Sequence, residues 1–185
     1  ADLFFVFQRP LDAYQLLEES LVFAKQDREY FRYYVQRCFM LDQDARLIAT
    51  ATKHLADPAV AEEIRADLRL AAAQAHFLRG DFADAARLIK EHRLDQTADG
   101  YLLNCQLLWE SGDREGALAE LDAALAVFPA GVRLLEMKAR WLKDSGDFRR
   151  AQDTLDLLSI SQPGRPGPLI QSLYLLPGEE GRVRR

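Results

Sequence analysis

The amino-acid sequence predicts an all-α fold, an α-α superhelix in which antiparallel helix hairpins stack into a solenoid. Two observations predict it. Residues of the same kind recur 34 positions apart, which is typical of stacked helical repeats. Apolar residues also follow helical spacing, and no segment has the convincing alternation of a half-buried strand. The sequence therefore contains the signals of helix pairs and no signal of a sheet.

The recurrence holds at four kinds of position. The pairs separated by 34 residues are Gly112-Asp113 and Gly146-Asp147, Ala117 and Ala151, Leu121 and Leu155, and Pro129 and Pro163. A further copy lies 32 residues upstream of the first, at Gly80-Asp81, Ala85 and Ile89. An offset shared by unlike residues indicates repetition of a whole structural unit.

Each unit is expected to contain two antiparallel helices. The first has one apolar face, and Gly112 then ends it, because glycine tolerates a positive φ. The second has a stripe that Pro129 ends, since proline cannot donate a backbone hydrogen bond to a continuing helix. Small residues such as Ala117 allow the two helices to approach closely. The two stripes are Tyr101, Asn104, Cys105 and Leu108, and Ala117, Leu121, Ala124, Leu125 and Phe128.

These positions resemble the tetratricopeptide repeat (TPR) family, whose pattern is W-x2-L-G-x2-Y, then A-x3-F, then P. Neither unit has the small Gly of the family, and both have a polar residue at its Leu position. The resemblance covers residues 66–163. One copy has Tyr101, Asn104-Cys105, Leu108, Ala117, Leu121 and Pro129, and the next has Leu135, Lys138-Ala139, Leu142, Ala151, Leu155 and Pro163.

The whole chain, residues 1–185, is interpreted as a single TPR-like solenoid and as a fragment of a longer chain. Asp42-Gln43-Asp44 interrupts one apolar stripe, which predicts a divergent hairpin there, and Pro58 suits the first turn of the next helix. A cluster of Pro and Gly after Pro163 precedes a short capping helix at Leu169–Leu176. The predicted segments are a helix at 10–25, the divergent hairpin at 27–57, repeats at 58–97, 98–131 and 132–163, and a C-terminal cap and tail at 164–185.

Composition excludes several classes of partner. With 24 Lys and Arg against 29 Asp and Glu, the net charge of -5 does not favour binding to nucleic acid or to an anionic membrane. No segment is apolar over the roughly 18 residues that a transmembrane helix needs. Cys38 and Cys105 are expected to be free, buried thiols, which fits either the cytoplasm or a bacterial periplasm.

The sequence offers no recognisable catalytic, cofactor or metal site. His54, His76 and His92 have no partner at metal-ligand spacing, and there is no Cys-x-x-Cys or Gly-rich phosphate loop. His76 lies where the family has its Tyr, and Cys105 lies at the small-residue position, so packing explains both. We therefore expect a protein that is not an enzyme and has no cofactor.

The resemblance implies that the concave face, lined by the first helix of each repeat, binds a protein or peptide partner. Trp109 is either an exposed hot spot or a packing residue against a neighbouring first helix, and Arg140 is either free or paired with Glu136. Gln74, Gln106 and Arg140 replace the Asn with which some relatives grip a terminal carboxylate, which disfavours such a clamp. The expected binding residues are Leu70, Gln74, Phe77, Leu102, Gln106, Trp109, Arg133, Glu136, Arg140 and Lys143.

Two further interpretations remain open. The chain is also similar to the helical periplasmic repeats of bacterial exopolysaccharide-export proteins, which implies a segment that guides a polysaccharide or docks a modifying enzyme. In addition, ten of the 18 aromatic residues lie in the first forty. They form either a bulkier core in divergent repeats or a docking surface. They include Phe4, Phe5, Phe7, Tyr30, Phe31, Tyr33 and Tyr34.

Overall fold

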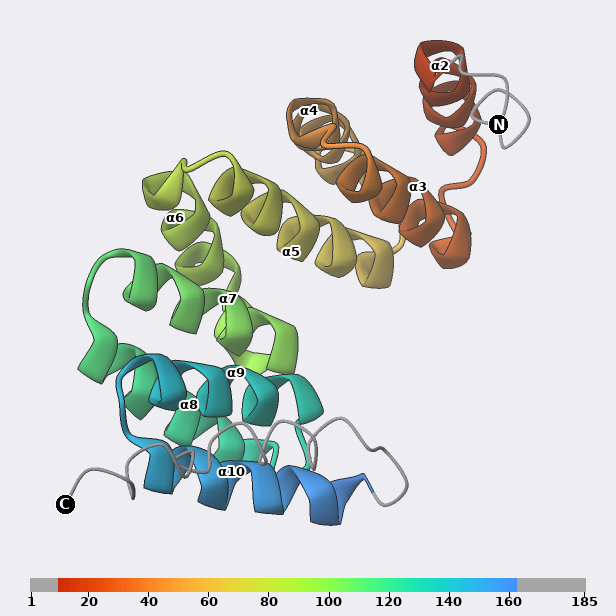
Figure 1. The fold of residues 1–185 in the computed structure, drawn as a ribbon. Helices are drawn as coiled ribbons and strands as arrows, with labels where there is room; N and C mark the ends of the chain where they lie inside the picture. The colour runs from red at the N-terminus through yellow and green to blue at the C-terminus, as the bar shows by residue number, and fades with distance from the viewer. Residues whose placement is uncertain (1–9, 163–185) are drawn as a thin grey trace, which may run out of the picture. The chain divides into compact units, whose positions relative to one another are not determined.

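The computed structural model describes residues 10–162, and over this range the secondary structure is helical, with no strand (Figure 1). The predicted all-α fold of TPR-like hairpins is confirmed. The expected capping helix at Leu169–Leu176 and the aromatic residues Phe4, Phe5 and Phe7 lie outside the described residues. The helices are α2 (Pro10–Leu21), α3 (Arg28–Met40), α4 (Asp44–Leu55), α5 (Glu62–Leu78), α6 (Phe82–His92), η1 (Leu94–Gln96), α7 (Ala98–Glu110), α8 (Arg114–Val127), α9 (Val132–Asp144) and α10 (Phe148–Ser161).

The chain divides into two compact units, Ala1–Leu94 and Asp95–Arg185. We call them the N-terminal unit, which contains α2 to α6, and the C-terminal unit, which contains α7 to α10. Consecutive helices pack closely in the pairs α5 and α6, α7 and α8, and α9 and α10. The fold is therefore built from helix hairpins within each unit, and a single continuous solenoid over the whole chain remains a prediction.

The turn inside each hairpin has the same backbone conformation. Its middle residue has a positive φ, which is 81° at Gly80, 89° at Gly112, 81° at Gly146 and 52° at Asp42. The N–H of the next residue then donates to a carbonyl near the end of the preceding helix, which satisfies an otherwise unpaired acceptor. These bonds are Gln43 to Cys38, Asp81 to His76, Asp113 to Leu108 and Asp147 to Leu142, at 2.9 to 3.0 Å. The divergent hairpin thus has the turn of the other three, although no glycine marks it.

The Asp of the Gly-Asp pair has a second role in the C-terminal unit. The Asp113 carboxylate accepts from the backbone N–H of Gly116 at 2.9 Å, and Asp147 accepts from Arg150 at 3.2 Å. Each bond caps the N-terminus of the following helix, where backbone donors lack intrahelical partners. The dipeptide therefore ends one helix and begins the next.

The core of the C-terminal unit consists of the repeated small and aliphatic residues. Ala117, Leu121, Ala124 and Ala151 are fully buried, as their predicted place at the helix contacts requires. They belong to two clusters, one that joins α7, α8 and α9 and one that joins α9 and α10. The repeated spacing therefore marks the packed face of each helix.

Two predicted boundaries in the N-terminal unit are wrong. The first helix ends at Leu21 and not at residue 25, because Lys25 turns toward the α4–α5 connection, where its carbonyl accepts from Ala61 N–H at 3.1 Å. Pro58 does not begin the next helix, since α5 starts at Glu62. Instead, Asp57 forms a turn around Pro58, with its carboxylate accepting from Ala59 N–H at 2.9 Å.

Candidate partner-binding surfaces

The predicted binding residues of the C-terminal unit lie on its two first helices, α7 and α9, which contact each other. Their exposure differs. Leu102 is only 3% exposed, Gln106 and Trp109 are half-buried, and Arg133, Glu136, Arg140 and Lys143 are exposed. Leu102 belongs to the core cluster with Leu134 and Trp141, so its expected role in partner contact is corrected to one in packing.

An ion pair joins equivalent positions of the two repeats. Arg133 on α9 donates to Asp99 on α7 at 2.5 Å, and the two residues are 34 positions apart in the chain. Both side chains are more than half exposed, so solvent screens the attraction. The pair offsets the positive charge of Arg133, which therefore adds little to the net charge of this surface.

Trp109 packs against the neighbouring first helix. Its ring stacks on that of Trp141, with centroids 4.4 Å apart and planes 8° from parallel. The Arg114 guanidinium also lies 5.1 Å from the Trp109 ring centroid, which is within the range of a cation–π interaction. Of the two interpretations of Trp109, packing is the one that these contacts support, although the side chain is only half-buried.

Two cations on α9 are available to a partner. Arg140 and Lys143 are exposed, and neither forms an ion pair with any residue of the described range. The alternative in which Arg140 pairs with Glu136 is therefore not observed. Because the two residues are three apart on one helix, their side chains lie on the same face. They give one face of α9 a local positive charge.

In the N-terminal unit, the predicted residues Leu70, Gln74 and Phe77 lie on α5, and all three are half-buried. The Phe77 ring lies 5.5 Å from that of Phe82 at the start of α6. Leu78, 55% exposed, and Phe82, 42% exposed, are also near this hairpin turn. This end of the hairpin is therefore apolar and partly open to solvent.

The histidines and cysteines have packing environments. His54 is buried with its ring edge against Phe31, His92 is exposed, and His76 Nδ1 is buried 3.5 Å from an Asp81 oxygen. Burial raises the pKa of the Cys38 thiol to about 11 and that of Cys105 to about 12. Neither thiol is therefore a nucleophilic thiolate at neutral pH. Residues 10–162 contain no group of three His, Cys, Asp or Glu residues placed to hold a metal.

A polar cluster joins α2, α3 and α4, and sequence reasoning missed it. The Tyr34 hydroxyl donates to Glu18 at 2.9 Å and lies 2.9 Å from the Thr50 hydroxyl. Arg46 donates to both Glu18 oxygens at 3.1 Å. Desolvation is the main cause of the raised pKa of Tyr34, which keeps its proton. No local signal marks this cluster, because its members become neighbours only when three helices pack together.

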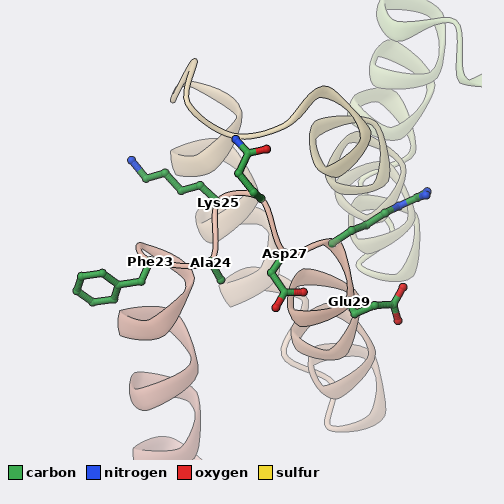
Figure 2. Close-up of a pocket in the computed structure, with 7 residues that line it drawn as sticks. Phe23, Ala24, Lys25, Asp27 and Glu29 are labelled. Carbon is green, nitrogen blue, oxygen red and sulfur yellow. The ribbon is translucent and has the colours of Figure 1, made fainter.

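The connection between α2 and α3 forms an open hollow of about 510 Å³, lined by residues 23–29. Figure 2 shows the Phe23 ring pointing away from the neighbouring helices, and this side chain is 90% exposed. Two of the charged groups are already paired, Lys25 with Asp57 at 2.6 Å and Arg28 with Asp67 at 2.7 Å. The hollow therefore offers one exposed aromatic ring on a connection anchored by ion pairs.

The described helices do not meet the requirements of a membrane span. None of those in residues 10–162 is both long and apolar enough to cross a bilayer.

Comparisons with known proteins identify the fold. No family model matches the chain, and no curated protein matches its sequence. Among solved structures, the chain is similar to YrrB, a TPR protein with an unusual peptide-binding site. The similarity covers 86% of this chain and 81% of YrrB, with a TM-score of 0.51 and 13% identity. At this identity the likeness concerns the fold, which agrees with the TPR-like hairpins derived from the repeats.

Proposed function

We propose that this protein is a non-catalytic scaffold that binds a protein or peptide partner through the first helices of its repeats. The observation that carries the proposal is the pair of unpaired, exposed cations, Arg140 and Lys143, on α9, the helix whose Trp141 stacks on the half-buried Trp109. Arginine and aromatic side chains are both enriched in protein-recognition surfaces. Acidic residues in the partner would complement the two cations.

The fold supports this proposal by analogy. YrrB, which has the same type of fold, is a TPR protein with a peptide-binding site. Stacked helix pairs leave their first helices open on one side and commonly bind partners there. Gln106, half-buried on α7, and Glu136, exposed on α9, complete the surface that we propose for the C-terminal unit.

The N-terminal unit offers a different surface. Leu70, Gln74 and Phe77 supply aliphatic, amide and aromatic groups and no charge. We propose that this part of α5 contacts apolar residues of the partner. Arg133, whose charge is paired with Asp99, contributes less net charge to recognition than Arg140 and Lys143.

The test uses fluorescent peptides of defined composition, acidic, neutral and basic, with binding measured by fluorescence polarisation. We expect the acidic peptides to bind, and Arg140→Glu to raise their Kd about tenfold or more, because an attraction becomes a repulsion. Arg149→Glu makes the same charge change at an exposed residue of α10 in the same unit, and it should leave the Kd nearly unchanged. Equal losses in both variants would show that only net charge matters and would remove α9 from the proposal.

The polysaccharide-export interpretation has no feature of the described residues in its favour, and we do not propose it. It would require binding of a neutral or acidic polysaccharide to the same first helices. Titration of the protein with such a polymer, monitored by the fluorescence of the stacked Trp109 and Trp141, is the corresponding measurement.

A further inference from the structure

A second hollow of the N-terminal unit lies between α2 and α4, and none of the predicted partner-binding residues lines it. Its volume is about 490 Å³, within the range of small-molecule pockets. It has one wall from α2, formed by Glu18, and the rest from α4. Its lining is Glu18, Ala45, Arg46, Ala49, Thr50, Lys53 and His54.

The spacing along α4 creates the hollow. Ala45, Ala49 and Lys53 are four residues apart, as are Arg46, Thr50 and His54, so each set forms a row along the helix. The alanines have short side chains and leave the space open. Arg46, Lys53 and His54 then stand around it with nitrogen atoms that can donate hydrogen bonds.

His54 is the most informative residue of the lining. It is only 4% exposed, and its ring nitrogens form no hydrogen bond with any residue of the described range. They are not among the fully buried unpaired atoms, which in residues 10–162 are Asp44 Oδ1 and His76 Nδ1. Since His54 lines the hollow, that space is where its unpaired nitrogens meet solvent. A ligand in the hollow would replace water as the hydrogen-bond partner of these nitrogens.

The two cations also have unused donors. Arg46 donates to Glu18 through Nη1, so its Nε and Nη2 groups form no hydrogen bond within the described residues. Lys53 is exposed and forms no ion pair there. Its charge acts on His54, whose pKa is lowered first by burial and then by Lys53. His54 is therefore neutral at pH 7 and donates through one ring N–H.

The one carboxylate among the described residues that line the hollow, that of Glu18, already accepts hydrogen bonds from the protein. The Glu18 carboxylate accepts from Arg46 and Tyr34, and it offsets one of the two positive charges of the lining. One positive charge and an excess of donors remain. This is the complement of a small anion with several oxygen acceptors.

We propose that the hollow between α2 and α4 binds a small oxyanion, a carboxylate or a phosphate, through Lys53, His54 and the free guanidinium nitrogens of Arg46. Ala45 and Ala49 leave room for the group that carries the charge. The proposal is independent of the partner-binding surface on α7 and α9, which belongs to the other unit.

The test is NMR titration of the full chain at pH 7 and constant ionic strength, with sodium acetate in one arm and inorganic phosphate in the other. We expect saturable shifts of the His54 ring signals in at least one arm. Lys53→Ala should raise the Kd of that anion about tenfold or more. Lys90→Ala removes an exposed lysine from α6 of the same unit and should leave Kd unchanged.

The two arms distinguish the source of the charge. Saturation by acetate alone assigns the hollow to carboxylates, and saturation by phosphate alone assigns it to phosphates. Shifts that never saturate in either arm overturn the proposal. Equal weakening by Lys53→Ala and Lys90→Ala also overturns it, because binding would then follow net charge. Both lysines are exposed, so loss of folding does not confuse this comparison.

Discussion

The two units are stabilised by different kinds of core. In the C-terminal unit, small and aliphatic residues repeat every 34 positions, and Ala117 and Ala151 occupy equivalent buried places. In the N-terminal unit, the large rings of Tyr14, Phe31 and Tyr34 fill the core, and the Tyr34 hydroxyl binds Glu18. The difference teaches that one hairpin geometry is compatible with a repetitive apolar core and with an irregular one that contains polar groups.

The largest expected effect, on stability, tests whether the two units unfold independently. Leu121→Ala removes a fully buried side chain of the C-terminal unit and should lower its free energy of unfolding by about 2–5 kcal/mol. Hydrogen exchange should show lost protection in α7 to α10 and unchanged protection in α3 to α5. Leu157→Ala, at a side chain 57% exposed, should change stability by less than about 0.5 kcal/mol. Equal loss of protection in both units would mean that they unfold together.

The next effect concerns the polar cluster. Tyr34→Phe removes the hydroxyl that contacts Glu18 and Thr50, and it should cost about 1–3 kcal/mol because Glu18 and Thr50 each lose one hydrogen-bond partner. Denaturant unfolding measures the loss. Tyr30→Phe, at a half-buried ring of the same helix, is the matched control. A stability equal to wild type in Tyr34→Phe would show that the core depends on the ring and not on the hydroxyl.

A pH effect should appear in both units. Burial raises the thiol pKa from 9.0 to about 11 for Cys38 and about 12 for Cys105. Above pH 9 the unfolded chain therefore loses these protons and the folded chain keeps them, so stability falls as pH rises, by about 1.4 kcal/mol per pH unit and thiol. Unfolding at pH 8 and pH 10 measures this, and Cys105→Ala should reduce the slope. An unchanged slope in that variant would assign it to other groups.

The smallest expected effect on stability comes from the hairpin turns of the two units, at Gly112 and Asp42. Gly112→Ala places a side chain at φ 89°, where no neighbouring atom lies within 4 Å, so the cost of about 1 kcal/mol comes from the backbone. The reverse change in the N-terminal unit, Asp42→Gly at φ 52°, should raise the melting temperature. Asp42→Asn should have little effect, because asparagine also tolerates this conformation. A destabilising Asp42→Gly would mean that the Asp42 side chain stabilises its turn.

The features that the sequence predicted are those that depend on local backbone or on spacing along one helix. Gly112 and Pro129 bounded α8 correctly because they act through the local backbone, and the burial of Ala117 followed from spacing. The end of α2 at Leu21 depended on Lys25 reaching the α4–α5 connection, a contact between distant segments. The stacking of Trp109 on Trp141 was one of two open interpretations, because spacing places a ring on a face but does not choose its neighbour. For the same reason the pairing of Glu18 with Arg46 was not predicted.

The Gly-Asp dipeptide has a consequence for protein engineering. Within two adjacent residues, Gly112-Asp113 and Gly146-Asp147 supply both a helix stop and a cap for the helix that follows. Asp99 in turn supplies the partner of an arginine one repeat later. A duplicated block of residues 98–131 would therefore bring its own turn and its own cap, but it would place Asp99 opposite a second Asp99, so an arginine at that second position is needed to restore the ion pair. Such a block is a portable module with which the array could be lengthened.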